Sequence, residues 1–263
     1  MNQDKLLHEV CQLARETGTF IREEIYKFSR KDVETKDHNS FVTYVDKESE
    51  KRLVYALSRM LPGSVFITEE GTVDQNPGEF TWIIDPLDGT TNFIHRLPVY
   101  AISIALVRDL EPLLGVVYEI NNSECFYAQE GGHAYLNGTP IRVSSTPSLE
   151  ASLMATGFPY YDYSRMESYL RVLQEYMQNT RGIRRMGSAA TDLAYVACGR
   201  FDGFFEYGLH PWDVAAGAFL VKQAGGLVGT FNGKNNYLFG KEIVAANPFI
   251  YEKMIATMNE FFG

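Results

Sequence analysis

The segment from Trp82 to Phe93 constrains the fold of this chain more than any other part of it. It reads Trp-Ile-Ile-Asp-Pro-Leu-Asp-Gly-Thr-Thr-Asn-Phe. A short apolar run, of the kind that forms a buried strand, leads into two aspartates, Asp85 and Asp88. Gly89 and Thr90 follow directly. Carboxylates that emerge together at a strand end are the hard oxygen ligands that Mg²⁺ prefers, so we expect a metal site here.

The backbone of this segment also suits a phosphate group beside the metal. Pro86 fixes its own φ and favours an extended Asp85, so we expect the strand to end sharply there with the Leu87 carbonyl free to act as a neutral ligand. Gly89 lets the backbone come close to a ligand. The amides of Gly89 and Thr90 are expected to open a helix, and a helix N-terminus binds phosphate oxygens.

Two further acidic segments strengthen this interpretation. Glu69 and Glu70 precede the strand, and Asp213 follows Pro211-Trp212 much later in the chain. Each acidic segment has an ordinary alternative: Asp-Pro-Leu-Asp-Gly is a common turn, the Glu-Glu pair suits a solvated loop, and Asp213 suits the first turn of a helix. The three together, each beside an apolar strand, favour the metal site.

The chain resembles the inositol monophosphatase family of magnesium-dependent phosphatases. The segments that carry the resemblance are Glu69–Gly71, Trp82–Phe93, Gly187–Ala190, Gly199–Glu206 and Trp212–Gly217 with its continuation to Gly226. They follow one another in the family's order along nearly the whole chain. The resemblance implies a layered α/β fold, the α-β-α-β-α sandwich of the inositol monophosphatase and fructose-1,6-bisphosphatase type.

The same resemblance implies a role for each matching residue. The metal ligands are Glu69, Asp85, Asp88, Asp213 and the carbonyl of Leu87. The catalytic residues are Asp46, Glu69 and Thr90, with Asp46 and Thr90 acting on the attacking water. The substrate is contacted by Asp88, Gly89, Thr90, Gly187, Ala189 and Glu206. The cofactor is two or three Mg²⁺ ions, for which Mn²⁺ can substitute.

The implied activity is hydrolysis of a small phosphorylated alcohol by metal-activated water, with inositol monophosphate as the favoured substrate. Fructose 1,6-bisphosphate, NADP(H) and 3′-phosphoadenosine 5′-phosphate stay open as alternatives. The sequence departs from many relatives at Thr68, and Gly157-Phe158-Pro159 falls where relatives vary. The resemblance further implies lithium sensitivity and a homodimer.

Two other functional classes fit these motifs less well. Haloacid dehalogenase-type phosphatases use Asp-x-Asp-Gly-Thr, with a nucleophilic aspartate two residues before the acid. Here Asp85 and Asp88 are three apart with a proline between, which disfavours that geometry. A calcium-binding module of the EF-hand type needs acids at alternate loop positions and a glutamate at the twelfth, and that spacing is absent.

Composition narrows the class of protein further. The chain has 263 residues, 45% of them hydrophobic, as in a globular enzyme. A formal net charge of −9 argues against a nucleic-acid surface, and no apolar stretch is long enough for a membrane span. Three cysteines without metal-ligand spacing favour reduced thiols and a cytoplasmic location.

Periodicity predicts two halves, residues 1–145 with the metal-binding motifs and residues 146–263 that complete the site. Helices are expected at 4–27, 44–60, 163–179, 188–198, 212–224 and the C-terminus. Strands are expected at 64–68, 81–84, 99–107, 113–120, 123–128, 151–156, 201–206 and 242–246. Asn121-Asn122 and Asn137-Gly138 are expected hairpin turns.

Two polar or aromatic segments keep two interpretations each. The aromatic segment 158–163 could form a substrate rim or an interface, although surface packing of a loop is the commoner explanation. Arg184 and Arg185 could touch a second phosphate, although a solvated strand end is at least as common.

Overall fold

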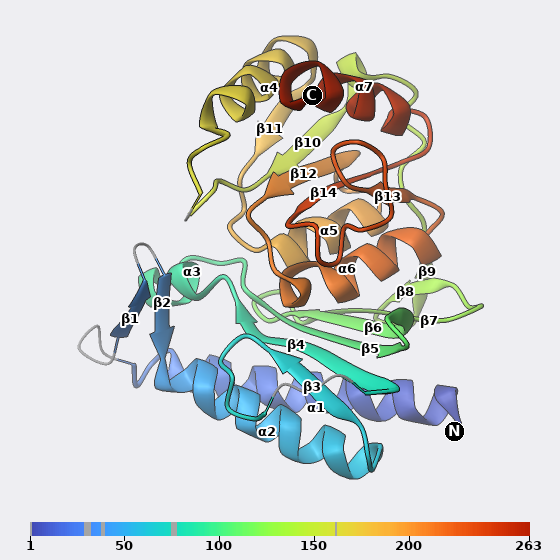
Figure 1. The fold of residues 1–263 in the computed structure, drawn as a ribbon. Coiled ribbons are helices and arrows are strands. Elements are labelled where there is room, and N and C mark those ends of the chain that lie inside the picture. Colours follow the sequence, from blue (N-terminus) through green and yellow to red (C-terminus); the bar gives the residue numbers. More distant parts are fainter. Residues whose placement is uncertain (1, 29–32, 38–39, 75–77, 161) are drawn as a thin grey trace.

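The computed structural model describes residues 2–28, 33–37, 40–74, 78–160 and 162–263. Tyr161, within the aromatic segment, lies outside them. Figure 1 shows five stacked layers, which confirms the expected α-β-α-β-α sandwich. The outer helical layers are α1 (Gln3–Glu24) with α2 (Tyr44–Met60), and α4 (Met166–Asn179) with α7 (Tyr251–Phe262). The middle layer is α5 (Ala189–Ala197) with α6 (Pro211–Gln223).

The first sheet brings the two acidic segments of the N-terminal half to one edge. Its strands run in the order β3 (Val65–Thr68), β4 (Phe80–Asp88), β5 (Ala101–Arg108), β6 (Glu111–Glu119), β7 (Glu124–Gln129), β8 (Ala134–Leu136) and β9 (Thr139–Ile141). Only the β3–β4 pair among these is parallel. Because parallel strands end at the same edge, Glu69 after β3 lies beside the acidic end of β4. A hairpin of β1 (Val33–Asp37) and β2 (Ser40–Thr43) leads into α2.

The expectation that Pro86 ends its strand sharply was wrong. Strand β4 continues through the proline to Asp88, and its pairing with β5 shifts register between Asp85 and Asp88. A bulge accommodates a proline in a sheet because the missing N–H falls where the ladder is interrupted. The bulge keeps both aspartates on one continuous strand.

The second sheet and the middle helices complete the core. The sheet order is β11 (Gly182–Arg184), β10 (Leu153–Thr156), β12 (Gly203–Tyr207), β14 (Glu242–Ala246) and β13 (Leu227–Gly229). Every residue of α5 is buried, and small residues let the layers approach closely. A Cβ at Gly217 on α6 would lie 2.6 Å from the Leu193 Cβ on α5. Both helices lie between the two sheets (Figure 1).

The predicted helices and strands are present with shifted ends, whereas the short strands β1, β2, β11 and β13 were not predicted. The short helix α3 (Thr90–His95) follows β4 directly, as the Gly-Thr motif predicts. Asn137-Gly138 forms the turn between β8 and β9. The division of the chain near residue 145 stays a prediction. Among the described residues, no helix combines the length and the apolar character that a membrane span requires.

Candidate active site

Three aspartates converge where the first sheet meets α6. Asp85 and Asp88 come from the bulged end of β4, and Asp213 comes from the first turn of α6. One oxygen from each lies within 4.8 Å of the others. Ser103 Oγ on β5 donates to the Trp212 carbonyl at 3.0 Å, which ties the start of α6 to the sheet. Hard oxygen donors at this spacing fit a divalent cation.

Burial and mutual repulsion disfavour the ionised forms of these aspartates. Burial raises the pKa of Asp85 well above its usual value, and the neighbouring charges of Glu69, Asp88 and Asp213 raise it further. Burial and then Asp88 raise the pKa of Asp213 in the same way. Burial raises the pKa of Asp88 to about 6, although a hydrogen bond from Ser188 lowers it. A bound cation would favour the ionised carboxylates and so lower these pKa values, which fits a metal to this donor set.

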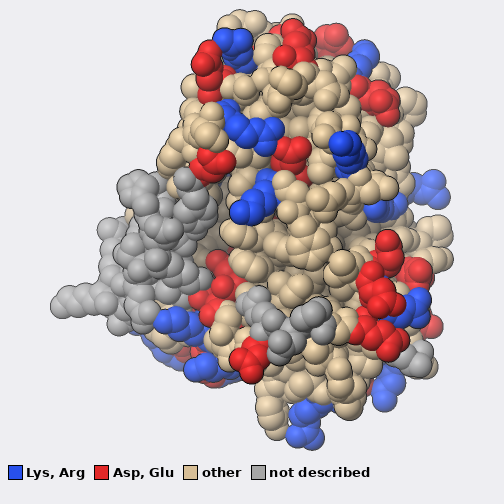
Figure 2. Space-filling view, viewed as in Figure 1, with Lys and Arg blue, Asp and Glu red and all other residues tan. Residues whose placement is uncertain are grey.

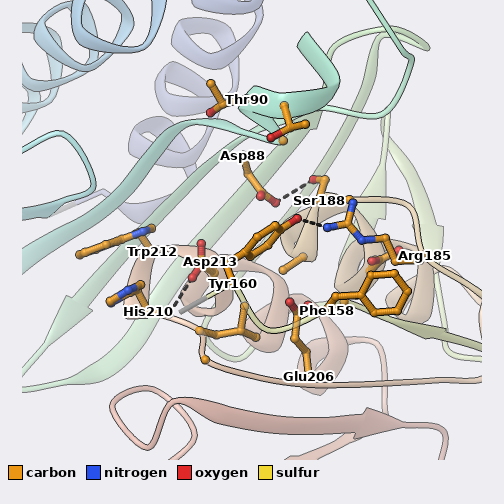
Figure 3. Close-up of a pocket in the computed structure, with 18 of the residues that line it drawn as sticks. Asp88, Thr90, Phe158, Tyr160, Arg185, Ser188, Glu206, His210, Trp212 and Asp213 are labelled. Carbon is orange, nitrogen blue, oxygen red and sulfur yellow. Dashed lines mark hydrogen bonds between the residues drawn. The ribbon is translucent and has the colours of Figure 1, made fainter. Parts of the chain in front are cut away.

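Each aspartate is oriented by hydrogen bonds from the protein. Asp88 Oδ2 accepts from Ser188 Oγ and from the Ala190 amide, both at 2.7 Å, across the junction of the two halves (Figure 3). Asp213 Oδ2 accepts from the His210 amide at 2.6 Å. Asp85 Oδ1 accepts from the Leu87 amide at 2.9 Å. The carboxylates are therefore held in place before any ligand binds.

A second polar group lies against the end of β4. Thr90 Oγ1 donates towards Asp46 Oδ1 at 2.9 Å and lies 3.1 Å from the Leu87 carbonyl oxygen. Asp46 is fully buried at the start of α2, where its other oxygen accepts from the Thr43 amide at 2.8 Å and hydroxyl at 2.5 Å. This capping box fixes the Asp46 side chain, so Asp46 and Thr90 form one oriented unit.

Glu50 on α2, which the sequence analysis did not identify, binds the loop that carries Glu69. Glu50 is fully buried, and its carboxylate accepts four hydrogen bonds. The donors are Thr68 Oγ1 at 3.0 Å and the Glu70 amide, the Thr72 amide and Thr72 Oγ1 at 2.7 Å each. The available signal was its helical spacing from Asp46, Leu53 and Leu57, which puts it on the buried face. The unusual Thr68 therefore has a structural partner.

Gly89 occupies the sharp corner between β4 and α3. Its φ is 98°, in the left-handed region that favours glycine. A Cβ there would lie 3.1 Å from the Val99 carbonyl oxygen and 3.2 Å from that of Gly187. Asn92 Nδ2 in the same turn donates to the carbonyls of Val99 and Met186, at 2.7 and 2.8 Å. The first amides of α3 lack partners within the helix and are available to an anion.

A cavity of about 250 Å³ opens beside these residues. Of the predicted site residues, those that line it are Glu69, Asp88, Gly89, Thr90, Gly187, Ala189, Glu206 and Asp213. Asp46 and Asp85 stand behind this lining and connect to it through Thr90 and the aspartate cluster. Leu87 is buried, with its carbonyl against Thr90.

Glu206 on β12 lines the cavity from the second sheet. It is buried, and burial raises its pKa to about 8 against the opposing effect of Arg185. Gly157 makes room for it, because a Cβ at that position would overlap the Glu206 carboxyl group. Gly157 therefore shapes the wall by lacking a side chain.

Two further residues line the cavity. No role was predicted for Asp192 from the sequence, and two interpretations stayed open for Arg185. Asp192 on α5 is buried, its Oδ1 has no hydrogen-bond partner among the described residues, and burial raises its pKa. Arg185 also lines the cavity, next to the rings of Phe158 and Tyr160 (Figure 3). No local pattern marks Asp192, which falls in an otherwise small and apolar helix.

Comparison with known proteins places this geometry in a family. A model of the inositol monophosphatase family matches residues 2–261. The chain is 41% identical over 256 residues to the Escherichia coli K12 protein named Nus factor SuhB, which covers 97% of this chain and 96% of that protein.

Solved structures agree with the sequence comparison. The extragenic suppressor protein suhB from Bartonella henselae has a TM-score of 0.91 and 36% identity, over 97% of this chain and 99% of that one. The inositol monophosphatase from Anabaena (Nostoc) has a TM-score of 0.87 and 33% identity, over 99% of this chain and 98% of that one.

Proposed function

The chain belongs to the inositol monophosphatase family, and from its site we propose a metal-dependent phosphomonoesterase that acts on a small phosphorylated alcohol, foremost inositol monophosphate. The observation that carries this proposal is the convergence of Asp85, Asp88 and Asp213 beside the oriented pair of Asp46 and Thr90. A site of this kind supplies metal ligands, a proton acceptor and phosphate-binding amides at one place.

The proposed metal ligands are the three aspartates, Glu69 and the Leu87 carbonyl, with two or three Mg²⁺ ions as the cofactor. Mn²⁺ also accepts hard oxygen ligands and should substitute. When bound, such ions supply positive charge to the phosphoryl and leaving oxygens and lower the pKa of water.

The chain's own residues would divide the remaining work. Asp46 and Thr90 would orient the attacking water and take its proton, since their bond at 2.9 Å already fixes both groups. The amides of Gly89 and Thr90 would bind phosphate oxygens at the start of α3. Gly187, Ala189 and Glu206 would contact the alcohol portion, with the Glu206 carboxyl facing substrate hydroxyls.

Phosphate release from a substrate panel tests the proposal. The panel is inositol 1-phosphate, fructose 1,6-bisphosphate, NADP and 3′-phosphoadenosine 5′-phosphate, each with Mg²⁺ and with EDTA. We expect the largest kcat/KM for inositol 1-phosphate and no release with EDTA. Trapping of a phosphoaspartate would instead support an aspartyl-phosphate mechanism. Phosphate release measured with added lithium tests the expected lithium sensitivity. The sedimentation coefficient of the protein tests the expected homodimer.

A second candidate function comes from the relatives named Nus factor SuhB. Such a role would act through the protein surface and not through hydrolysis. On the face seen in Figure 2, acidic and basic side chains are interspersed, which fits a protein partner better than direct contact with nucleic acid. RNA polymerase binding that survives Asp88→Asn would favour this role, and failure to bind the polymerase would count against it.

A further inference from the structure

The adjacent residues Arg184 and Arg185 have different environments. Arg184 ends β11, is exposed, and its Nη1 donates to the carbonyl of the preceding Ile183 at 3.1 Å. Arg185 lines the cavity, where its guanidinium points toward Tyr160 (Figure 3). Of the two interpretations open for this pair, the solvated strand end suits Arg184 and contact with a ligand suits Arg185.

The Arg185 guanidinium is held by aromatic residues. Its Nη2 donates to the Tyr160 hydroxyl, and its Cζ lies 5.4 Å from the Phe158 ring centre and 5.5 Å from that of Tyr160. A Cβ at Gly187 would lie only 2.7 Å from Nη1, so this glycine leaves the space that the guanidinium fills. Arg185 is thereby fixed next to the residues expected to contact the alcohol portion.

The guanidinium is nevertheless not fully satisfied. Its Nε is buried without a hydrogen-bond partner, and Arg185 forms no ion pair within the described part of the chain. Arg185 as a whole is part-buried, so a ligand in the cavity can reach the guanidinium, and a buried donor without a partner is unfavourable until one completes it. Burial also raises the pKa of Glu206 and Asp192 on the same wall, which weakens their compensation of the positive charge.

We propose that Arg185 is a specificity-determining residue that binds a second anionic group, a carboxylate or a phosphate, on the alcohol portion of the substrate. The planar guanidinium matches both anions through paired N–H donors, and its aromatic neighbours hold it in position for them. This inference rests on the proposed phosphatase function, and it extends the substrate class from neutral polyol phosphates to phosphorylated alcohols that carry a further negative charge.

Two substrate pairs that differ in that charge test the inference. Glycerol 3-phosphate and 3-phosphoglycerate differ by a hydroxymethyl against a carboxylate, and fructose 1-phosphate and fructose 1,6-bisphosphate differ by a phosphate. We expect wild-type kcat/KM to favour the charged member of at least one pair by about 10- to 100-fold, the size of a charge-assisted hydrogen bond. The favoured pair identifies the anion.

Variants assign that preference to the guanidinium. Arg185→Gln should reduce the ratio within the pair to about one, because both members are measured on the same protein preparation. Arg185→Lys keeps the charge without the planar fork and should retain part of the ratio. Arg184→Gln is the matched control and should leave the ratio unchanged.

The inference is overturned if the wild-type protein shows no preference in either pair. It is also overturned if Arg185→Gln lowers kcat/KM equally for both members, because Arg185 would then be a fixed counter-charge for the acidic cluster. If the wild-type protein hydrolyses none of these compounds nor inositol 1-phosphate, the proposed function fails instead. In that case, calorimetry measures the Kd of 3-phosphoglycerate and of glycerol 3-phosphate for the wild-type protein and for Arg185→Gln. A ratio of the two Kd values that falls to about one in the variant supports the inference, and an unchanged ratio overturns it.

Discussion

The two sides of the cavity differ in how far the protein satisfies its own polar groups. We call the side with the aspartate cluster the metal side and the side with Arg185, Asp192 and Glu206 the alcohol side, after their proposed roles. On the metal side, Asp46, Asp88 and Glu50 each accept at least two hydrogen bonds from the surrounding elements. On the alcohol side, Asp192 Oδ1 and Arg185 Nε are buried without a hydrogen-bond partner among the described residues. The difference teaches that the metal side is preorganised for one chemistry, whereas the alcohol side depends on its ligand.

This comparison has a direct experimental meaning. Changes on the metal side should reduce turnover of every substrate, because they act on the phosphate and the water. Changes on the alcohol side should alter the choice between substrates. The following variants test that contrast.

Asp88→Asn should have the largest effect. It removes a charge from the centre of the metal ligands while keeping the shape of the side chain. We expect kcat to fall by at least about 10²–10³-fold on all substrates, as for loss of a key transition-state group. The metal-free protein should be no less stable than wild type, since like-charge repulsion is relieved.

Asp109→Asn is the matched control for that variant. Asp109 is exposed and follows β5 at the opposite end of its pairing with β4. Its activity should equal that of wild type. A near-normal kcat for Asp88→Asn, measured by phosphate release, would reduce Asp88 to a turn residue.

Glu50→Gln should come next, through the position of Glu69. The amide would present N–H donors to a set of backbone and hydroxyl donors that need an acceptor. We expect the Mg²⁺ concentration for half-maximal activity to rise about 10- to 100-fold, with partial recovery of kcat at saturating Mg²⁺. Glu48→Gln, half-exposed on the same helix, should not change it. A lower melting temperature with an unchanged Mg²⁺ requirement would make Glu50 a purely structural residue.

Glu206→Gln should have a smaller effect that depends on the substrate. Replacing the carboxyl group removes one of the oxygens that would bind substrate hydroxyls, so KM for inositol 1-phosphate should rise about tenfold with a smaller change in kcat. For p-nitrophenyl phosphate, whose leaving group has no hydroxyl, kcat/KM should hardly change. Equal losses on both substrates would move Glu206 to the catalytic side of the comparison.

The smallest expected effect is on stability. Burial raises the pKa of Asp88 from 3.8 to about 6 and that of Glu206 from 4.5 to about 8 in the metal-free protein. The folded state then binds more protons than the unfolded state between about pH 4 and 8, so its stability falls as the pH rises through this window. The melting temperature in EDTA should therefore drop by several degrees from pH 5 to pH 8.

Mg²⁺ supplies the control for that measurement. It should raise the melting temperature more at pH 8 than at pH 5, because it binds the ionised carboxylates. A melting temperature in EDTA that rises over the same range would show that the buried acids are already compensated within the protein.

Sequence reasoning reached the metal side because its residues lie in contiguous motifs. The segment from Trp82 to Phe93 places the strand, the aspartates and the helix start within local reach of one another. It failed at Pro86, because only the partner strand β5 shows that the proline sits in a bulge.

The role of Arg185 on the alcohol side could not be predicted from a local motif. Arg184 and Arg185 are equivalent in local pattern, and only the approach of Phe158 and Tyr160 from a distant segment distinguishes them. Helical spacing places Glu50 on the buried face of α2, but only the packing of the Glu69 loop supplies its hydrogen-bond donors. Contacts between distant segments, and not propensity, decide these roles.

The central claim is that the clustered aspartates Asp85, Asp88 and Asp213 hold the metal ions on which phosphate hydrolysis depends. Its most direct test is phosphate release from inositol 1-phosphate after exhaustive chelation, followed by titration with Mg²⁺ and calorimetry of Mg²⁺ binding. We expect no release after chelation, full recovery on titration, and loss of Mg²⁺ binding in Asp88→Asn. Full activity in the chelated protein, or unchanged Mg²⁺ binding by Asp88→Asn, would contradict the account.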